Sequence, residues 1–224
     1  MDKYTTYRNE EITRMNCGKF ICFCGLDACG KSTQAKYLMD YFLEYGVKSQ
    51  VVHGFKNGRH SEKLKEQVGI LNGVFHNSYT PEMRSLSYVC DIMEKYIDVI
   101  KPLIDNGVYV ISDKYKVESL VYAPLFDCRK ELIYPFINII PNPDIYIYLS
   151  IEPQISYQRL LKRVCVTGET LSPKDDIKCM IKSKTRFDEF YNNNDNCFLI
   201  DANNDEKDIH DNILRLLYEK KILS

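Results

Sequence analysis

FICFCGLDACGKSTQAKYL, residues 20–38, contains the pattern G-x-x-x-x-G-K-S between Gly25 and Ser32. This is the phosphate-binding P-loop pattern, in which glycines let consecutive backbone amides converge on a phosphate. The apolar run before Gly25 has the composition of a buried strand, and the residues after Lys31 follow the apolar period of a helix. A P-loop connects a strand to a helix, so both flanking segments support the motif. The stretch therefore predicts a nucleotide-binding α/β protein.

The rest of the chain alternates between short apolar runs and longer amphipathic segments. Strands are predicted at residues 19–24, 48–55, 108–112, 143–150 and 197–201. Helices are predicted at residues 31–46, 80–107, 116–138, 153–164, 174–191 and 205–221, with a polar stretch at 56–78. Pro102 should kink its helix, and Pro124 and Pro135 should break theirs. Five strands separated by helices predict a three-layer α/β P-loop NTPase fold with a five-stranded parallel sheet flanked by helices.

Composition fits one ordinary globular domain. The chain has 224 residues, of which 45% are hydrophobic and 27% charged, and its net charge is -1. This charge offers no bulk attraction to nucleic acid or an anionic membrane, and no apolar run approaches the roughly 20 residues of a membrane span. The nine cysteines show no paired metal-ligand spacing and fit reduced thiols. We expect a cytoplasmic protein with a flexible tail at 1–17 and one domain at 18–224.

The P-loop also indicates which side chains would hold ATP and Mg²⁺. Lys31 is placed to reach the β- and γ-phosphates, and the Ser32 hydroxyl to bind Mg²⁺. The apolar strand at 108–112 ends at Asp113, the usual form of the carboxylate near such a metal, although a turn residue is the alternative. We expect the phosphates to contact Gly25, Leu26, Asp27, Ala28, Cys29, Gly30, Lys31, Ser32 and Thr33.

The chain lacks the markers of other P-loop classes. No Asn-Lys-x-Asp motif of a GTPase and no Ser-Gly-Gly signature of an ABC-type ATPase is present, and the chain is too short for a helicase core. A small kinase remains. Its segments, in order, resemble the thymidylate kinase family: GLDACGKSTQ at 25–34, GFKNGRHS at 54–61, SDKYKVESLVYA at 112–123, PNPDIYIYL at 141–149 and a basic lid within QRLLKRVCVTGET at 158–170.

This resemblance covers about residues 18–220 and implies transfer of the ATP γ-phosphoryl group to a nucleoside monophosphate, with dTMP expected. It places a lid around 159–173 and implies a homodimer through the long helix that begins near Pro81. Because Ala28 stands where some members carry an arginine, the lid would supply a cation from Arg159, Lys162 or Arg163. The implied catalytic residues are Asp27, Lys31, Asp113, Arg159 and Arg163, and the implied substrate-binding residues are Asp27, Phe55, Arg59, Tyr88, Lys114, Tyr115 and Tyr122.

Two positions depart from the family pattern. Lys114 replaces an arginine, so the charge remains but the planar fork is lost. Ile92 replaces the arginine that reads thymine, while Arg84 lies two helical turns earlier. Two alternatives therefore stay open: a kinase of the same fold for another nucleotide such as dUMP, and a nucleotide-binding regulatory protein that has lost efficient transfer.

Overall fold

A five-stranded parallel sheet forms the centre of the molecule. The computed structural model describes residues 17–54, 58–70, 78–168 and 171–223. The strands are β1 (Phe20–Cys24), β2 (Ser49–Val52), β3 (Tyr109–Ser112), β4 (Ile145–Ser150) and β5 (Cys197–Asp201). They lie in the order β2-β3-β1-β4-β5, and every pairing is parallel. The predicted three-layer α/β fold with a five-stranded parallel sheet is confirmed.

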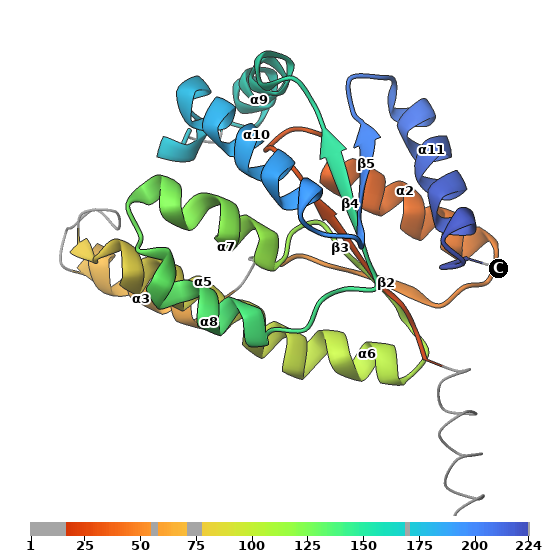
Figure 1. Cartoon of the computed structure of the whole chain (residues 1–224), viewed down its shortest axis with the longest axis horizontal. Helices are drawn as coiled ribbons and strands as arrows, with labels where there is room; N and C mark the ends of the chain where they lie inside the picture. The colour runs from red at the N-terminus through yellow and green to blue at the C-terminus, as the bar shows by residue number, and fades with distance from the viewer. Residues whose placement is uncertain (1–16, 55–57, 71–77, 169–170, 224) are drawn as a thin grey trace, which may run out of the picture.

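Helices cover both faces of this sheet (Figure 1). The helices α2 and α11 contact each other on one face of the sheet, whereas α5, α7 and α10 lie on the other face. The helices are α2 (Lys31–Glu44), α3 (Arg59–Ile70), α5 (Pro81–Lys95), α6 (Lys101–Asp105), α7 (Lys116–Tyr122), α8 (Lys130–Ile139), α9 (Pro153–Thr167), α10 (Ile177–Asn192) and α11 (Glu206–Glu219). Within the described ranges, no helix combines the length and the apolar character that crossing a membrane requires.

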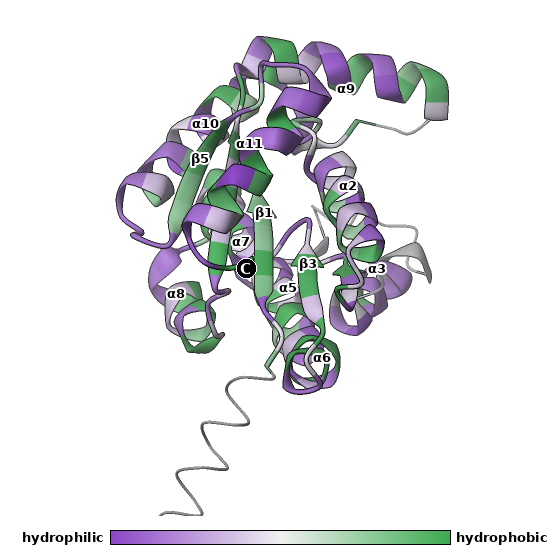
Figure 2. Cartoon of the chain, turned by 90° about the vertical axis from the view of Figure 1, so that its right-hand side faces the viewer, coloured by the Kyte–Doolittle hydropathy of each residue, from purple (hydrophilic) through white to green (hydrophobic). Residues whose placement is uncertain are grey.

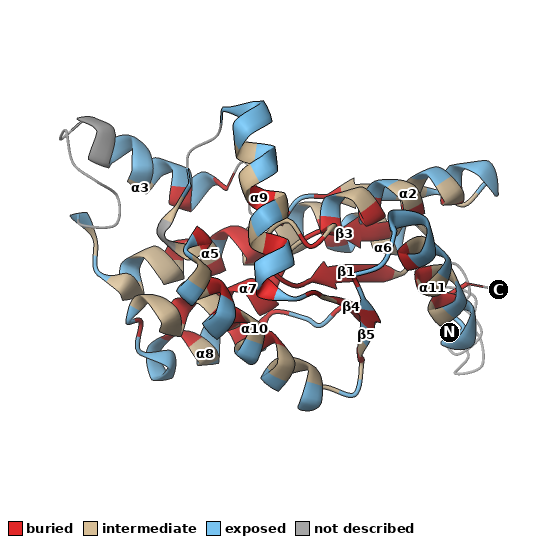
Figure 3. Cartoon of the chain, turned by 90° about the horizontal axis from the view of Figure 1, so that it is seen from above, coloured by how far each residue is buried: buried red, intermediate tan, exposed pale blue. Residues whose placement is uncertain are grey.

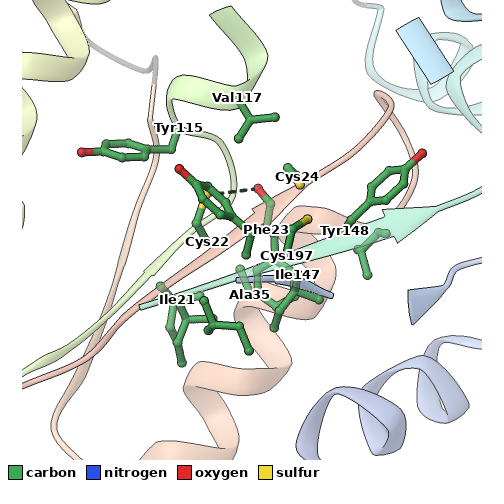
Figure 4. Close-up of a cluster of buried hydrophobic side chains, with 14 of the residues drawn as sticks. Ile21, Cys22, Phe23, Cys24, Ala35, Tyr115, Val117, Ile147, Tyr148 and Cys197 are labelled. Carbon is green, nitrogen blue, oxygen red and sulfur yellow. Dashed lines mark hydrogen bonds between the residues drawn. The ribbon is translucent and has the colours of Figure 1, made fainter. Parts of the chain in front are cut away.

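The core is built on β1, because helices on both faces of the sheet exclude water from it. All five residues of β1 are buried. Figure 4 shows side chains of β1, β4 and β5 gathered with Ala35 of α2 and Val117 of α7. Cys22, Cys24 and Cys197 are buried free thiols in this cluster. Figure 2 shows that β1, β3 and β5 are mostly hydrophobic, whereas the helices have one hydrophilic and one hydrophobic side.

Residues 56–78 were predicted as a polar stretch, and this prediction was incomplete because they contain α3. The carboxylate of Asp91 accepts hydrogen bonds from the backbone amides of His60, at 2.7 Å, and Ser61, at 3.1 Å. Asp91 thus satisfies the free amides at the start of α3 from a position on α5. No local pattern reveals such a distant cap, which explains the omission.

One proline prediction also needs correction. Pro135 lies inside α8 rather than breaking it. Its missing N–H removes only the hydrogen bond to the first turn of that helix. Pro102 falls in the first turn of α6, and the kink predicted there stays a prediction. A π-helical turn, Tyr96–Ile100, precedes it and adjusts the helix before the proline.

Candidate active site

The P-loop folds between β1 and α2 as the motif predicts. Gly25 has a φ of 138° and Gly30 a φ of 107°, in the region that favours glycine. A Cβ added to Gly25 would lie 2.6 Å from the carbonyl oxygen of Leu149. The chain therefore needs glycine there both for backbone shape and for space. The loop turns directly into the N-terminus of α2, whose free amides favour an anion.

The ammonium group of Lys31 is held inside this loop. Its Nζ donates hydrogen bonds to the carbonyl oxygens of Gly25, at 2.8 Å, and Leu26, at 2.7 Å. Only 5% of the Lys31 side chain is exposed, and its Nζ lies 4.0 Å from Oδ1 of Asp27. A phosphate in the loop would find this charge already within it, which fits the predicted role.

The two predicted metal ligands lie in direct contact. Ser32 Oγ, in the first turn of α2, donates a hydrogen bond of 2.8 Å to Oδ2 of Asp113, which directly follows β3. His53 Nδ1 lies 2.9 Å from the same oxygen, a contact that the sequence analysis did not identify. A hydroxyl and a carboxylate are oxygen donors of the kind that Mg²⁺ prefers. The pair therefore fits the expected ion.

Asp27 is surrounded by three lysines from different parts of the chain. Its carboxylate pairs with Lys174, just beyond the predicted lid, and with Lys114, whose Nζ lies 2.9 Å away, and it faces Lys31. Burial alone would raise the pKa of Asp27, but Lys114, Lys174 and Lys31 outweigh that effect and hold the pKa well below its usual range. Asp27 is therefore charged at neutral pH, and it keeps three cations together beside the P-loop.

Two cavities meet beside this cluster. The first, called here the P-loop cavity, has a volume of about 590 Å³ and is lined by residues 27–34, 204–206, Ile209, Lys114, Arg159 and Arg163. The second, called here the α5 cavity, has a volume of about 320 Å³. It is lined by Lys65, Pro81, Arg84, Ser85, Tyr88, Lys114, Glu118, Ser119, Tyr122, Ala123, Phe126, Ser172 and Lys174. Lys114 lines both, so the two cavities lie next to each other.

The lid cations differ in position. Arg159 and Arg163 of α9 line the P-loop cavity, and Arg159 Nη1 donates to the carbonyl oxygen of Ala202 at 3.2 Å. Lys162 is exposed and lines neither cavity. Figure 3 shows α9 projecting from the buried sheet with mostly exposed residues. Of the three candidates, the two arginines are therefore placed to reach a bound phosphate.

Two predicted substrate contacts lie away from the cavities. Arg59 Nη1 lies 2.9 Å from Oε1 of Glu94, its side chain is 75% exposed, and it lines neither cavity. Tyr115 is only 1% exposed and packs edge-on against Phe20, with ring centroids 4.9 Å apart. The side chain of Arg59 forms an ion pair, and that of Tyr115 packs in the core. The structure therefore gives no support to the substrate-binding roles predicted for these two residues. Phe55 lies outside the described residues.

Tyr88 and Tyr122 do line the α5 cavity, as expected. Lys174 carries no sequence signal; it lies one residue beyond the predicted lid, and its Nζ is 5.6 Å from the centroid of the Tyr122 ring. The sequence analysis did not identify Glu118, which is 3% exposed and accepts a hydrogen bond of 2.9 Å from the amide of Tyr115. Burial raises the pKa of Glu118 to about 7, although Lys31 opposes this shift.

A P-loop with a lysine held inside it, a hydroxyl and a carboxylate in contact beside it and a second cavity next to it fits the class of P-loop phosphotransferases. The family model described as thymidylate kinase matches residues 23–213 of the chain. The chain belongs to the thymidylate kinase family.

Individual relatives align with this chain over most of their length. The thymidylate kinase of Brachyspira hyodysenteriae is 27% identical over 207 residues, covering 92% of this chain and 96% of that protein. The thymidylate kinase of Francisella tularensis subsp. novicida is 28% identical over 209 residues, covering 89% and 95%. A probable thymidylate kinase of Thermococcus gammatolerans is 26% identical over 217 residues, covering 92% and 99%. The range matched by the family model, residues 23–213, contains every residue that lines the two cavities.

Proposed function

We propose that this protein transfers the γ-phosphoryl group of ATP to dTMP and forms dTDP. The observation that supports this most directly is the position of Lys114, which lines both the P-loop cavity and the α5 cavity. A kinase of this type must hold the donor and acceptor phosphates in line at one point. Family membership adds dTMP as the acceptor, because the relatives named above are thymidylate kinases.

ATP would place its phosphates on the P-loop amides. Lys31 would contact the β- and γ-phosphates from inside the loop, and Arg159 and Arg163 would approach from α9. Ser32 and Asp113 would hold Mg²⁺, which neutralises phosphate charge when bound. These residues already lie at one edge of the sheet, so charge stabilisation would need little rearrangement.

The acceptor would occupy the α5 cavity with its phosphate on Lys114. Tyr88 would stack on the base, and Tyr122 would bound the sugar. Lys174 would approach the transferred group from the lid, since it pairs with Asp27 and lines the same cavity as Tyr88. Closure of the lid would exclude water, which otherwise would hydrolyse ATP.

The same resemblance supports three broader proposals. Residues 18–224 would act as one kinase domain, and the lid predicted around 159–173 would extend to Asp175 and so include Lys174. The protein would be cytoplasmic and would form a homodimer through the face of α5. Light scattering on the purified protein tests the dimer, with a mass of twice 26.2 kDa as the expected result.

A panel of acceptors tests the proposed function. ADP formation would be followed with ATP, Mg²⁺ and dTMP, dUMP, dCMP, dAMP or dGMP. We expect kcat/KM to be highest for dTMP, with kcat in the range of about 1–100 s⁻¹. A higher value for dUMP or another acceptor would reassign the substrate. ATP binding without turnover on any acceptor would identify a nucleotide-binding protein that lacks transfer.

A further inference from the structure

Position 92 cannot contribute to base recognition in this chain. Ile92 is 1% exposed and belongs to the hydrophobic core. An aliphatic side chain has no hydrogen-bonding group, and this one does not line the α5 cavity. If the cavity selects a base by hydrogen bonding, another residue must supply the donor.

Arg84 is placed to supply it. Arg84 and Tyr88 are four residues apart on α5, so their side chains share one face of the helix, and both line the α5 cavity. Helical side chains lean toward the N-terminus of their helix, so Arg84 covers the part of the cavity near Pro81. Arg84 is half-buried and its Nε is fully buried, which reduces competition from water.

The two ends of the cavity have different chemistry. Lys114 marks the phosphate end, because it pairs with Asp27 of the P-loop. Pro81 and Arg84 lie in the first turn of α5, which contacts α3 on the side of the molecule away from α11 (Figure 1). A nucleotide with its phosphate on Lys114 and its base on Tyr88 would therefore direct the far edge of the base toward Arg84.

A guanidinium group donates hydrogen bonds and accepts none. The 4-keto oxygen of thymine or uracil would accept from it, whereas the 4-amino group of cytosine presents further donors. We propose that Arg84 reads the base edge and makes the α5 cavity select 4-keto pyrimidines over 4-amino pyrimidines. Lys65, whose Nζ lies 5.9 Å from the centroid of the Tyr88 ring, adds positive charge to the same cavity. This inference rests on the proposed function and assigns one of its determinants of specificity.

Equilibrium binding of dTMP and dCMP to Arg84→Met tests the inference. We expect the Kd for dTMP to rise about 10- to 100-fold, as for loss of a charge-assisted hydrogen bond. The Kd for dCMP should change less than about threefold, and the KM for ATP should stay the same because Arg84 lies outside the P-loop cavity. Arg84→Lys should fall between wild type and Arg84→Met, since it keeps the charge and loses the fork.

Arg129→Met is the matched control. Arg129 is 70% exposed, pairs with Glu82 at 3.1 Å and lines neither cavity, so its loss should leave both Kd values unchanged. An unchanged ratio of the Kd values for dTMP and dCMP in Arg84→Met would overturn the base-reading role. If both Kd values rise equally, the result would indicate a phosphate contact instead. If Arg84→Met does not fold, Arg84→Gln supplies the same measurement.

Binding separates this inference from the proposed function. A wild-type protein that binds dTMP more tightly than dCMP but does not phosphorylate it would refute the kinase proposal, and the Arg84 comparison would still decide the inference. A wild-type protein that phosphorylates monophosphates but binds dTMP and dCMP equally would refute the role of Arg84 alone. Binding of neither pyrimidine would refute both.

Discussion

Lys114 Nζ lies 2.9 Å from Oδ1 of Asp27, so a residue that follows β3 pairs with the acid of the P-loop where the two cavities meet. The pair joins positions 87 residues apart. Lys174 and Lys31 surround the same carboxylate. One anion therefore keeps three cations close to the point where a phosphoryl group would pass.

Replacing Asp27 with asparagine should destabilise the protein by about 3 kcal/mol at pH 7, because three ammonium groups would lose their buried counter-charge. The pKa of Asp27 is lowered on folding, so its contribution is present above the unfolded pKa and is lost as pH falls through the folded value. Urea unfolding at several pH values would measure this. The difference between wild type and Asp27→Asn should be constant from pH 5 to 8 and shrink below about pH 4.

Asp201→Asn provides a matched control, because Asp201 is an exposed carboxylate whose side chain contacts Asn203 rather than a lysine. It should change the free energy of unfolding by less than about 0.5 kcal/mol. Equal stability of wild type and Asp27→Asn at neutral pH would show that the lysines do not depend on this carboxylate.

Glu118 should give the opposite pH dependence. Burial raises its pKa to about 7, so the folded protein binds a proton there that the unfolded chain releases at lower pH. Stability should therefore fall as pH rises from about 4.5 to about 7, by on the order of 3 kcal/mol from this group. Glu118→Gln should remove that decline and be more stable than wild type at pH 8. Urea midpoints at pH 5 and pH 8 would measure the difference, and Glu131→Gln, at an exposed position, should leave the wild-type decline unchanged.

The sequence predicted the sheet and the P-loop because their signals are local. The two glycines, Lys31 and Ser32 all lie within residues 25–32, and most strands are short apolar runs. Asp113 was predictable because it directly follows such a strand.

The remaining site could not be predicted in the same way, because tertiary contacts decide it. Arg59 matches a motif in order, but Glu94 on α5 holds its guanidinium outside the cavities. Tyr115 and Tyr122 belong to the same sequence segment, 112–123, yet packing buries Tyr115 in the core and leaves Tyr122 lining the α5 cavity. Lys174 carries no motif, and only the fold of the lid brings it to Asp27.

Lys31→Ala should lower kcat at least 100-fold, because it removes the ammonium group held inside the P-loop where phosphate charge develops. Steady-state kinetics with ATP and dTMP would measure the loss. Lys36→Ala is the control, since Lys36 is exposed on the same helix and lines neither cavity. Full activity of Lys31→Ala in a folded protein would contradict the assignment of the donor site.

Lys174→Ala should lower kcat about 10- to 100-fold while the KM for ATP changes little. Lys174 pairs with Asp27, lines the α5 cavity and approaches the Tyr122 ring, whereas it does not line the P-loop cavity. Its ammonium group is therefore placed to act on the transferred group rather than on ATP binding. Steady-state kinetics with varied ATP and varied dTMP would separate these effects.

Lys162→Ala is the matched comparison, because Lys162 lies within the lid on α9, is exposed and lines neither cavity. It should retain wild-type kcat. The arginines provide the contrast: Arg159→Ala or Arg163→Ala should raise the KM for ATP as well as lower kcat, since both line the P-loop cavity. If Lys174→Ala keeps wild-type kcat as Lys162→Ala does, the lid cation must be one of the arginines. The contact between Lys174 and Asp27 would then serve only to hold the lid near the P-loop.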